Sequence, residues 1–174
     1  MGAELDFTSV SLPALYEELL PAVYRMAYSY LRDHHDSEDV AREAFLRLAR
    51  SGRRFEDKRQ VEAWLIVTAA NLSRDLLRRQ GRRDLPLEEA RQSAQAERPR
   101  AGDLREALLA LPEKYKLPIY LYYYAGCSVA EIARALHRGE NTVETWLSRG
   151  RQRLRESLTE DTRDETSGKG GTVR

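Results

Sequence analysis

Apolar residues in this chain recur every three to four positions, in two groups separated by a stretch that lacks the pattern. This spacing places apolar side chains on one face of a helix. The first group covers residues 10–81 and the second covers residues 103–158. Residues 82–102 contain Pro86 and Pro99 among mixed charges, which is typical of a linker. We therefore expect an all-α protein of two small helical domains joined by a flexible linker.

The first domain is expected to contain three helices. Residues 12–27 and 40–48 each carry an apolar face, and the second of them follows an acidic segment that suits the positive end of a helix dipole. A third helix, over residues 61–76, is apolar on several sides, so we expect it to be buried on most of them. Gly81 follows its last turn, where a left-handed residue ends a helix at little cost.

The second domain begins with a helix over residues 104–111, which Pro112 ends. Residues 113–125 form a tyrosine-rich apolar stretch that we expect to be helical, although Pro118 disfavours a regular helix through the preceding turn. Residues 159–174 combine acids, basic residues and glycines without an apolar face, and we expect them to form a disordered tail.

Residues 128–158 predict a helix-turn-helix. Ser128 and Glu131 have the spacing of a capping box at the start of a short helix. Gly139 then breaks the chain, and a longer helix is expected from Thr142 to about Leu158, with its apolar residues on one face. A short helix, a tight turn and a long helix in this order are typical of a DNA-binding unit.

The opposite face of the longer helix carries side chains that could contact DNA. Between Trp146 and Arg155 there are four arginines and no acid. Recognition helices place such residues on base edges and phosphates. Arginines on a solvated face also serve solubility alone, but the capped short helix and the turn before them favour DNA binding. The candidate contacts on this face are Thr142, Thr145, Ser148, Arg149, Arg151, Gln152 and Arg155.

Motifs in both domains, from about Leu15 to Leu158, match one known family. In the second domain, LPEKY at residues 111–115 and GCSVAEIA at residues 126–133 precede the arginine-rich helix. This block resembles region 4 of the extracytoplasmic-function (ECF) sigma factors of the sigma-70 family. In the first domain, DSEDVAREAFLRL at residues 36–48 resembles region 2.2. The segment that follows, with AWL and ANL within it, resembles the part of region 2 that opens the minus 10 element.

The resemblance implies an alternative sigma factor, which binds core RNA polymerase and directs it to promoters. It assigns the helix-turn-helix residues above to the minus 35 element. It places polymerase contacts at Glu38, Asp39, Arg42, Glu43, Phe45 and Leu46. It places minus 10 contacts at Phe55, Asn71, Arg74, Arg78, Arg79, Arg82 and Arg83. Residues 51–60 would hold the pocket for a flipped base of the non-template strand, and the family's usual regulatory partner is an anti-sigma factor.

Several of these residue types also suit a purely structural role. Acids such as Glu38 in a first turn complement a helix dipole whether or not polymerase binds. Phe45 and Phe55 could contact partners or close the core of the domain. Glu144 and Trp146 stand where the family commonly has basic residues, so the resemblance does not extend to the promoter sequence that is recognised.

The sequence also bears on other classes of function. A stand-alone helix-turn-helix regulator would need only the second domain, with the first serving as a dimerisation or sensor module. An enzyme is not expected, because no glycine-rich phosphate loop or nucleophile arrangement is present. Cys127 and the three histidines have no metal-ligand spacing, so neither a metal nor a cofactor is expected. The absence of a secretory start or a membrane-length apolar window predicts a cytoplasmic protein without membrane insertion.

Overall fold

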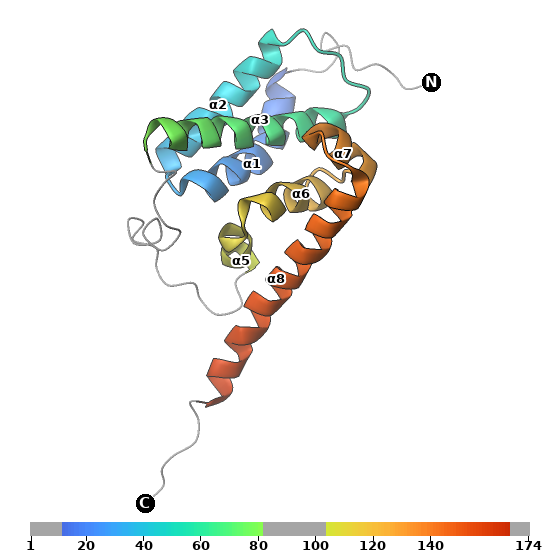
Figure 1. The fold of residues 1–174 in the computed structure, drawn as a ribbon. Helices are drawn as coiled ribbons and strands as arrows, with labels where there is room; N and C mark the ends of the chain where they lie inside the picture. Colours follow the sequence, from blue (N-terminus) through green and yellow to red (C-terminus); the bar gives the residue numbers. More distant parts are fainter. Residues whose placement is uncertain (1–11, 82–103, 168–174) are drawn as a thin grey trace, which may run out of the picture.

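The computed structural model describes residues 12–81 and 104–167, with side chains up to Thr159. The predicted linker, Arg82, Arg83 and residues 168–174 lie outside the described residues. Within the described ranges the chain forms seven helices, which confirms the all-α prediction (Figure 1). They are α1 (Leu12–Leu31), α2 (His34–Arg50), α3 (Lys58–Arg79), α5 (Leu104–Ala110), α6 (Glu113–Tyr123), α7 (Val129–Leu136) and α8 (Glu140–Ser167). No helix in the described part is both long and apolar enough to span a membrane.

Helices α1, α2 and α3 pack against one another around the apolar faces that the sequence predicts. Met26, Val61 and Leu65 are completely buried in this core. Aspartate caps set the starts of two of the helices. The Asp33 carboxylate accepts a hydrogen bond of 2.8 Å from the Asp36 amide, so α2 begins before the predicted acidic segment. The third helix ends as expected, with Gly81 in the left-handed region at φ 67°.

Helices α5 to α8 form the second domain, in which α6 and α7 both pack on α8. The predicted capping box of α7 is confirmed, since Ser128 and Glu131 each accept a hydrogen bond from the other's backbone amide. The turn that follows differs from the prediction. His137, with φ 53°, is the left-handed residue that ends α7, whereas Gly139 has no positive φ.

Helix α8 is longer than the sequence pattern indicated. It continues past Leu158 to Ser167, whereas a disordered tail was expected from residue 159. The physical reason is that no proline or glycine stands between Gly150 and Ser167, so nothing in the backbone ends the helix. The loss of the apolar face was therefore not a signal for the end of the helix.

The two domains contact each other directly. Helix α3 packs on α6 and α7, and α1 packs on α5. The buried apolar side chains of both domains form one continuous cluster. Figure 1 shows α3 lying across the end of the second domain where α6 and α7 meet. The arrangement of the domains therefore matters for the accessibility of the predicted contacts on α3.

Candidate nucleic-acid and polymerase interfaces

The exposed face of α8 brings together all seven residues predicted for the minus 35 element. Every one of them is exposed, while Val143 and Leu147 on the opposite side are buried against the domain. The Thr145 hydroxyl donates a hydrogen bond of 2.8 Å to the Asn141 carbonyl, which leaves its oxygen free to accept another. Side chains from Ser148 to Thr159 line a shallow polar groove along this face. The geometry suits a helix that enters a major groove.

Arg149 differs from its neighbours because it also interacts with Tyr115 of α6. Burial would raise the pKa of the Tyr115 hydroxyl, but hydrogen bonds from Lys114 and Arg149 outweigh it, so that the pKa is lowered. Tyr115 is itself held in the core of the domain. Arg149 therefore lies close to the hydroxyl of Tyr115 while its side chain stays exposed on α8.

The turn between α7 and α8 adds basic residues that the sequence analysis missed. Arg134, His137 and Arg138 are exposed and line a second groove beside the start of α8. Their position at the entrance of the recognition helix suits contacts with DNA phosphates. These residues could have been predicted from the sequence, because a helix-turn-helix commonly contacts the DNA backbone through the residues around its turn.

The predicted polymerase face lies on α2. Arg42 bridges Glu38 at 3.0 Å and Asp39 at 2.6 Å on the exposed side of this helix. Leu46 is 47% exposed beside them, and several other large apolar side chains of the described residues are exposed as well. Its charged surroundings are compatible with a protein interface, in which an apolar contact is surrounded by polar ones.

Two phenylalanines of the predicted contact sets are buried. The Phe45 ring packs at a tilt against Tyr16, with 4.8 Å between ring centres, and Phe55 packs edge-on against Trp64 at 6.3 Å. Their exposed fractions are 5% and 6%. Their chemistry explains this outcome, since a phenylalanine ring has no polar group that favours the surface. We therefore assign both rings to the core of the first domain.

The predicted minus 10 residues of α3 divide into two groups. Asn71, Arg78 and Arg79 are exposed, and Arg78 pairs with Asp75 on the same helix. Arg74 instead points to the second domain, where its Nε lies 2.9 Å from a carboxylate oxygen of Glu113. The sequence could not indicate this pairing, because the two residues are brought together only by the contact between the domains.

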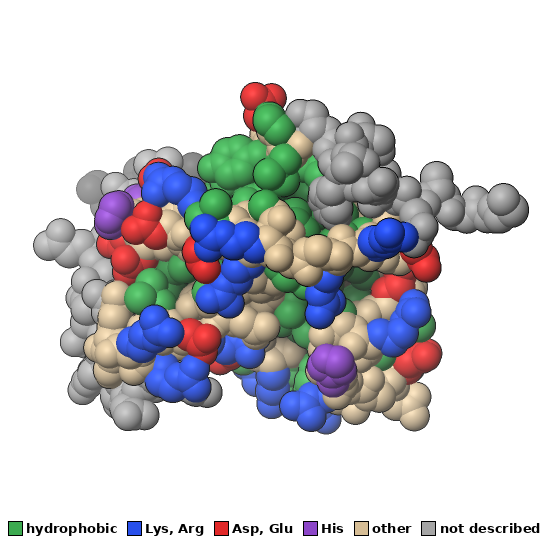
Figure 2. All heavy atoms as spheres, turned by 90° about the horizontal axis from the view of Figure 1, so that it is seen from above, with side chains coloured by type: hydrophobic (Ala, Val, Ile, Leu, Met, Phe, Trp, Pro, Cys, Tyr) green, Lys and Arg blue, Asp and Glu red, His purple; other side chains and the backbone are tan. Residues whose placement is uncertain are grey.

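Further basic side chains lie before and at the start of α3. Arg53, Arg54 and Arg59 are exposed around the segment that precedes this helix, and none of them was predicted as a contact. Figure 2 shows Lys and Arg side chains spread across the face of the molecule seen from above. Asp57 caps α3 by accepting a hydrogen bond of 2.9 Å from the Gln60 amide, which holds the pKa of this carboxyl below its usual range.

Comparisons with known proteins identify both domains. Residues 15–83 match the family model described as sigma-70 region 2, and residues 101–154 match sigma-70 region 4. The ECF RNA polymerase sigma factor SigE of Mycolicibacterium smegmatis is 34% identical over 147 residues, which cover 78% of this chain and 57% of that protein. The ECF RNA polymerase sigma factor SigM of Mycobacterium tuberculosis is 31% identical over 137 residues, covering 76% of this chain and 69% of SigM.

A solved structure shares the fold. The sigma factor RpoE of Bartonella quintana, determined in complex with the anti-sigma factor NepR, superposes with a TM-score of 0.60 at 23% identity. The match covers 84% of this chain and 96% of RpoE. Region 2 and region 4 occur in tandem here, and a stand-alone helix-turn-helix regulator has no counterpart of region 2. The chain belongs to the ECF family of RNA polymerase sigma factors, which are transcription initiation factors and not enzymes.

Proposed function

We propose that this protein is an alternative sigma factor that recruits core RNA polymerase to promoters through both of its domains. Residues 10–81 act as region 2, residues 82–102 as the linker, and residues 103–158 as region 4. The observation that carries the proposal is the tandem of an acidic, leucine-bearing face on α2 and an arginine-rich exposed face on α8. Binding energy, and no covalent step, would drive promoter opening.

Region 4 is proposed to bind the minus 35 element through α8. Thr145, Ser148 and Arg149 lie near the N-terminal end of this helix, where side chains meet base edges. Arg151 and Arg155 lie further along and are proposed to hold phosphates, as Arg134 and Arg138 do at the turn. Bidentate contacts of arginine to guanine each contribute about 1–3 kcal/mol of discrimination, so Arg149 should dominate the sequence preference.

Region 2 is proposed to bind the minus 10 element through α3 and the segment before it. Asn71, Arg78 and Arg79 offer one amide and two guanidinium groups on the exposed face. Arg82 and Arg83 would extend the basic ridge, although they lie outside the described residues. Arginines in this arrangement bind phosphates without regard to sequence, so affinity should fall steeply with salt.

The polymerase contact is proposed to lie on α2, with Leu46 as its apolar centre. Glu38, Asp39 and Glu43 present carboxylates around it, which complement a basic surface on the polymerase. Arg42 orders two of these carboxylates through its paired contacts. Such pre-ordering reduces the entropy that is lost when the side chains bind.

Purified protein should be mixed with core polymerase and a pool of genomic promoter fragments, and the transcripts mapped. We expect transcripts with defined start sites that core polymerase alone does not produce. Reversing Arg149 to glutamate should alter which promoters are used, whereas Arg78→Glu should weaken all of them and flatten the salt dependence. Failure to co-elute with core polymerase on a sizing column would contradict the proposed function.

Two further properties are proposed on the same basis. An anti-sigma factor would be the regulatory partner, as NepR is the partner of RpoE in its solved complex. The protein would act in the cytoplasm, where the polymerase and promoter DNA are found. Pull-down of a tagged chain before and after stress, followed by sequencing of the captured proteins, tests the first of these.

A further inference from the structure

The contact between the two domains contains a buried lysine. Lys116 is 6% exposed, although it is charged in free solution. Its ammonium nitrogen, on α6, donates a hydrogen bond of 2.7 Å to the Ser29 carbonyl of α1 and one of 3.2 Å to the Leu109 carbonyl. It also lies 5.1 Å from the centre of the Tyr30 ring. A side chain of the second domain is thus seated on the backbone of the first.

Next to Lys116, an acid of the second domain holds a basic residue of α3. Glu113 pairs with Arg74 at 2.9 Å, and the Arg74 guanidinium lies 5.8 Å from the centre of the Tyr30 ring. Arg74 belongs to the predicted minus 10 ridge, yet its side chain is only 33% exposed. The carboxylate of Glu113 therefore gives the guanidinium of Arg74 a negatively charged partner, as a DNA phosphate would.

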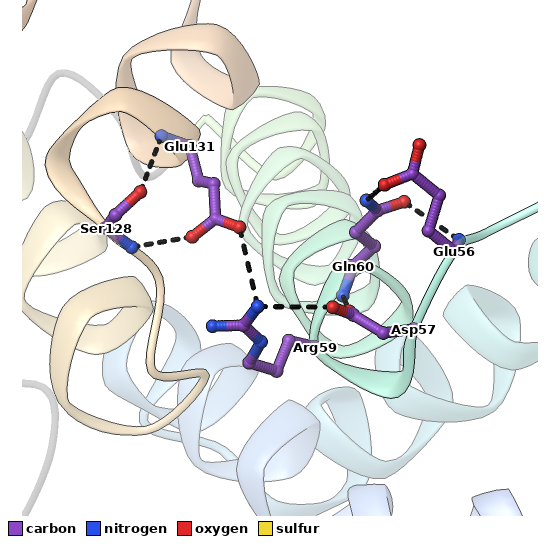
Figure 3. Close-up of polar contacts among 6 residues, drawn as sticks. All are labelled: Glu56, Asp57, Arg59, Gln60, Ser128 and Glu131. Carbon is purple, nitrogen blue, oxygen red and sulfur yellow. Dashed lines mark hydrogen bonds and ion pairs between the residues drawn. The ribbon is translucent and has the colours of Figure 1, made fainter. Parts of the chain in front are cut away.

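A longer and more exposed ion pair joins the domains at the other end of α3, where the Arg59 side chain is 56% exposed. Figure 3 shows Arg59 extending from α3 toward Glu131 at the start of α7, with its Nη2 3.9 Å from Glu131 and 3.2 Å from Asp57. The Ser128 amide hydrogen-bonds to Glu131 and holds the pKa of this carboxyl below its usual range, so it carries a negative charge at neutral pH.

Part of the segment before α3 is held by its own hydrogen bonds. The Glu56 amide donates to the Gln60 side chain at 3.1 Å, and that side chain donates back to the Glu56 carboxylate at 3.0 Å. This is the segment in which the flipped promoter base is expected to bind. Glu56, Asp57 and Gln60 are thus paired within the segment, and Arg59 lies between Asp57 and Glu131 of the second domain (Figure 3).

We propose that the second domain masks two arginines at the minus 10 face of the first, with Glu113 and Glu131 taking the positions of promoter phosphates beside Arg74 and Arg59 on α3. The free chain is closed, and DNA competes with these two acids for Arg74 and Arg59. That the competing DNA is a promoter rests on the proposed function, whereas the contact between the two domains does not depend on it. The outward face of α8 lies away from this contact, so the minus 35 residues stay exposed, as do Asn71, Arg78 and Arg79 on α3, while Arg74 and Arg59 face acids of the second domain.

The closed state is tested by a charge swap across the Arg74–Glu113 pair. Small-angle X-ray scattering should be recorded for the full chain and for R74E, E113R and R74E/E113R. A compact chain of this length has a radius of gyration of roughly 16 Å, and both single variants should be more extended than the unmodified chain. The double variant should return toward the unmodified value. An extended unmodified chain, or a double variant as extended as the single ones, would overturn the proposal.

Masking is tested by the binding of labelled single-stranded DNA to the chain alone, followed by fluorescence anisotropy. E113Q and E131Q should each bind several-fold more tightly than E17Q, which removes the same charge from an exposed position on α1. The glutamine side chain of E131Q can still accept the Ser128 amide in the capping box, so α7 should remain folded. Each freed arginine should steepen the salt dependence by about one phosphate contact. Affinities equal to that of E17Q would overturn masking, whatever the scattering shows, and neither experiment depends on the transcription assay.

Discussion

Replacing Gly150 with alanine should destabilise the second domain, although alanine is the better helix former. Gly150 lies in the middle of α8 and faces α6. A Cβ atom at this position would lie 3.0 Å from Cγ1 and 3.2 Å from Cδ1 of Ile119, and 3.3 Å from Cβ of Tyr115. Ile119 is itself 1% exposed, so it has little space into which to move.

The change in the free energy of unfolding caused by Gly150→Ala is the sum of two opposing effects. Helix propensity favours alanine over glycine by about 1 kcal/mol, whereas an extra methyl group in a packed core costs about 1–3 kcal/mol. The net loss should therefore be about 1 kcal/mol, which corresponds to a fall in Tm of about 2–4 °C for a chain of this size. Because α6 sets the position of α8, the same change should also weaken binding to a minus 35 duplex.

Thermal unfolding followed by circular dichroism measures this loss. Ser157→Ala is the matched control, since Ser157 is exposed on the same helix and alanine there should be neutral or slightly stabilising. Ile119→Val should cost less in the Gly150→Ala background than on its own, because it removes one of the crowded carbons. A Tm for Gly150→Ala equal to or above that of the unmodified chain would refute the packing argument.

Burial lowers the pKa of Lys116 to about 7, and Arg32 adds to this effect while Glu113 opposes it. Lysine in an unfolded chain has a pKa of about 10.4, so between pH 7 and this value the unfolded chain binds more protons than the folded one. The free energy of unfolding, measured by urea titration, should therefore rise from about pH 7 to 9. K116M should lose this rise. Ser128→Ala should cost about 1 kcal/mol of stability in the same assay, through loss of the α7 cap. Leu46→Asp should weaken binding to core polymerase with no fall in Tm, because this side chain is exposed; a lowered Tm would place it in the core instead.

Local patterns in the sequence predicted the helices well, because each depends on residues that are close in the chain. The capping box of Ser128 and Glu131 and the left-handed Gly81 are examples in which a few neighbouring residues determine the backbone. The exposed face of α8 followed from the helical period alone. These features needed no knowledge of the other domain.

Features that depend on contacts across the chain were not predictable in this way. The partner of Arg74 lies beyond the linker, and no pattern in the sequence relates the two residues. Phe55 is suited both to the core and to stacking on a base, and its packing against Trp64 depends on a residue that the local sequence pattern does not relate to it. The end of α8 was placed too early for a different reason, because the apolar face was used as the marker for a helix whose backbone had no break.

The length of α8 has a mechanical consequence. At a rise of 1.5 Å per residue, its 28 residues make a rod of about 42 Å, and Figure 1 shows its last turns extending beyond the rest of the second domain. A tilt of only about 5° around one end would displace the other by roughly 4 Å, more than the length of a hydrogen bond. A protein that binds the C-terminal end of α8 would therefore displace the N-terminal part of the helix, which is proposed to contact bases, without contacting that part directly.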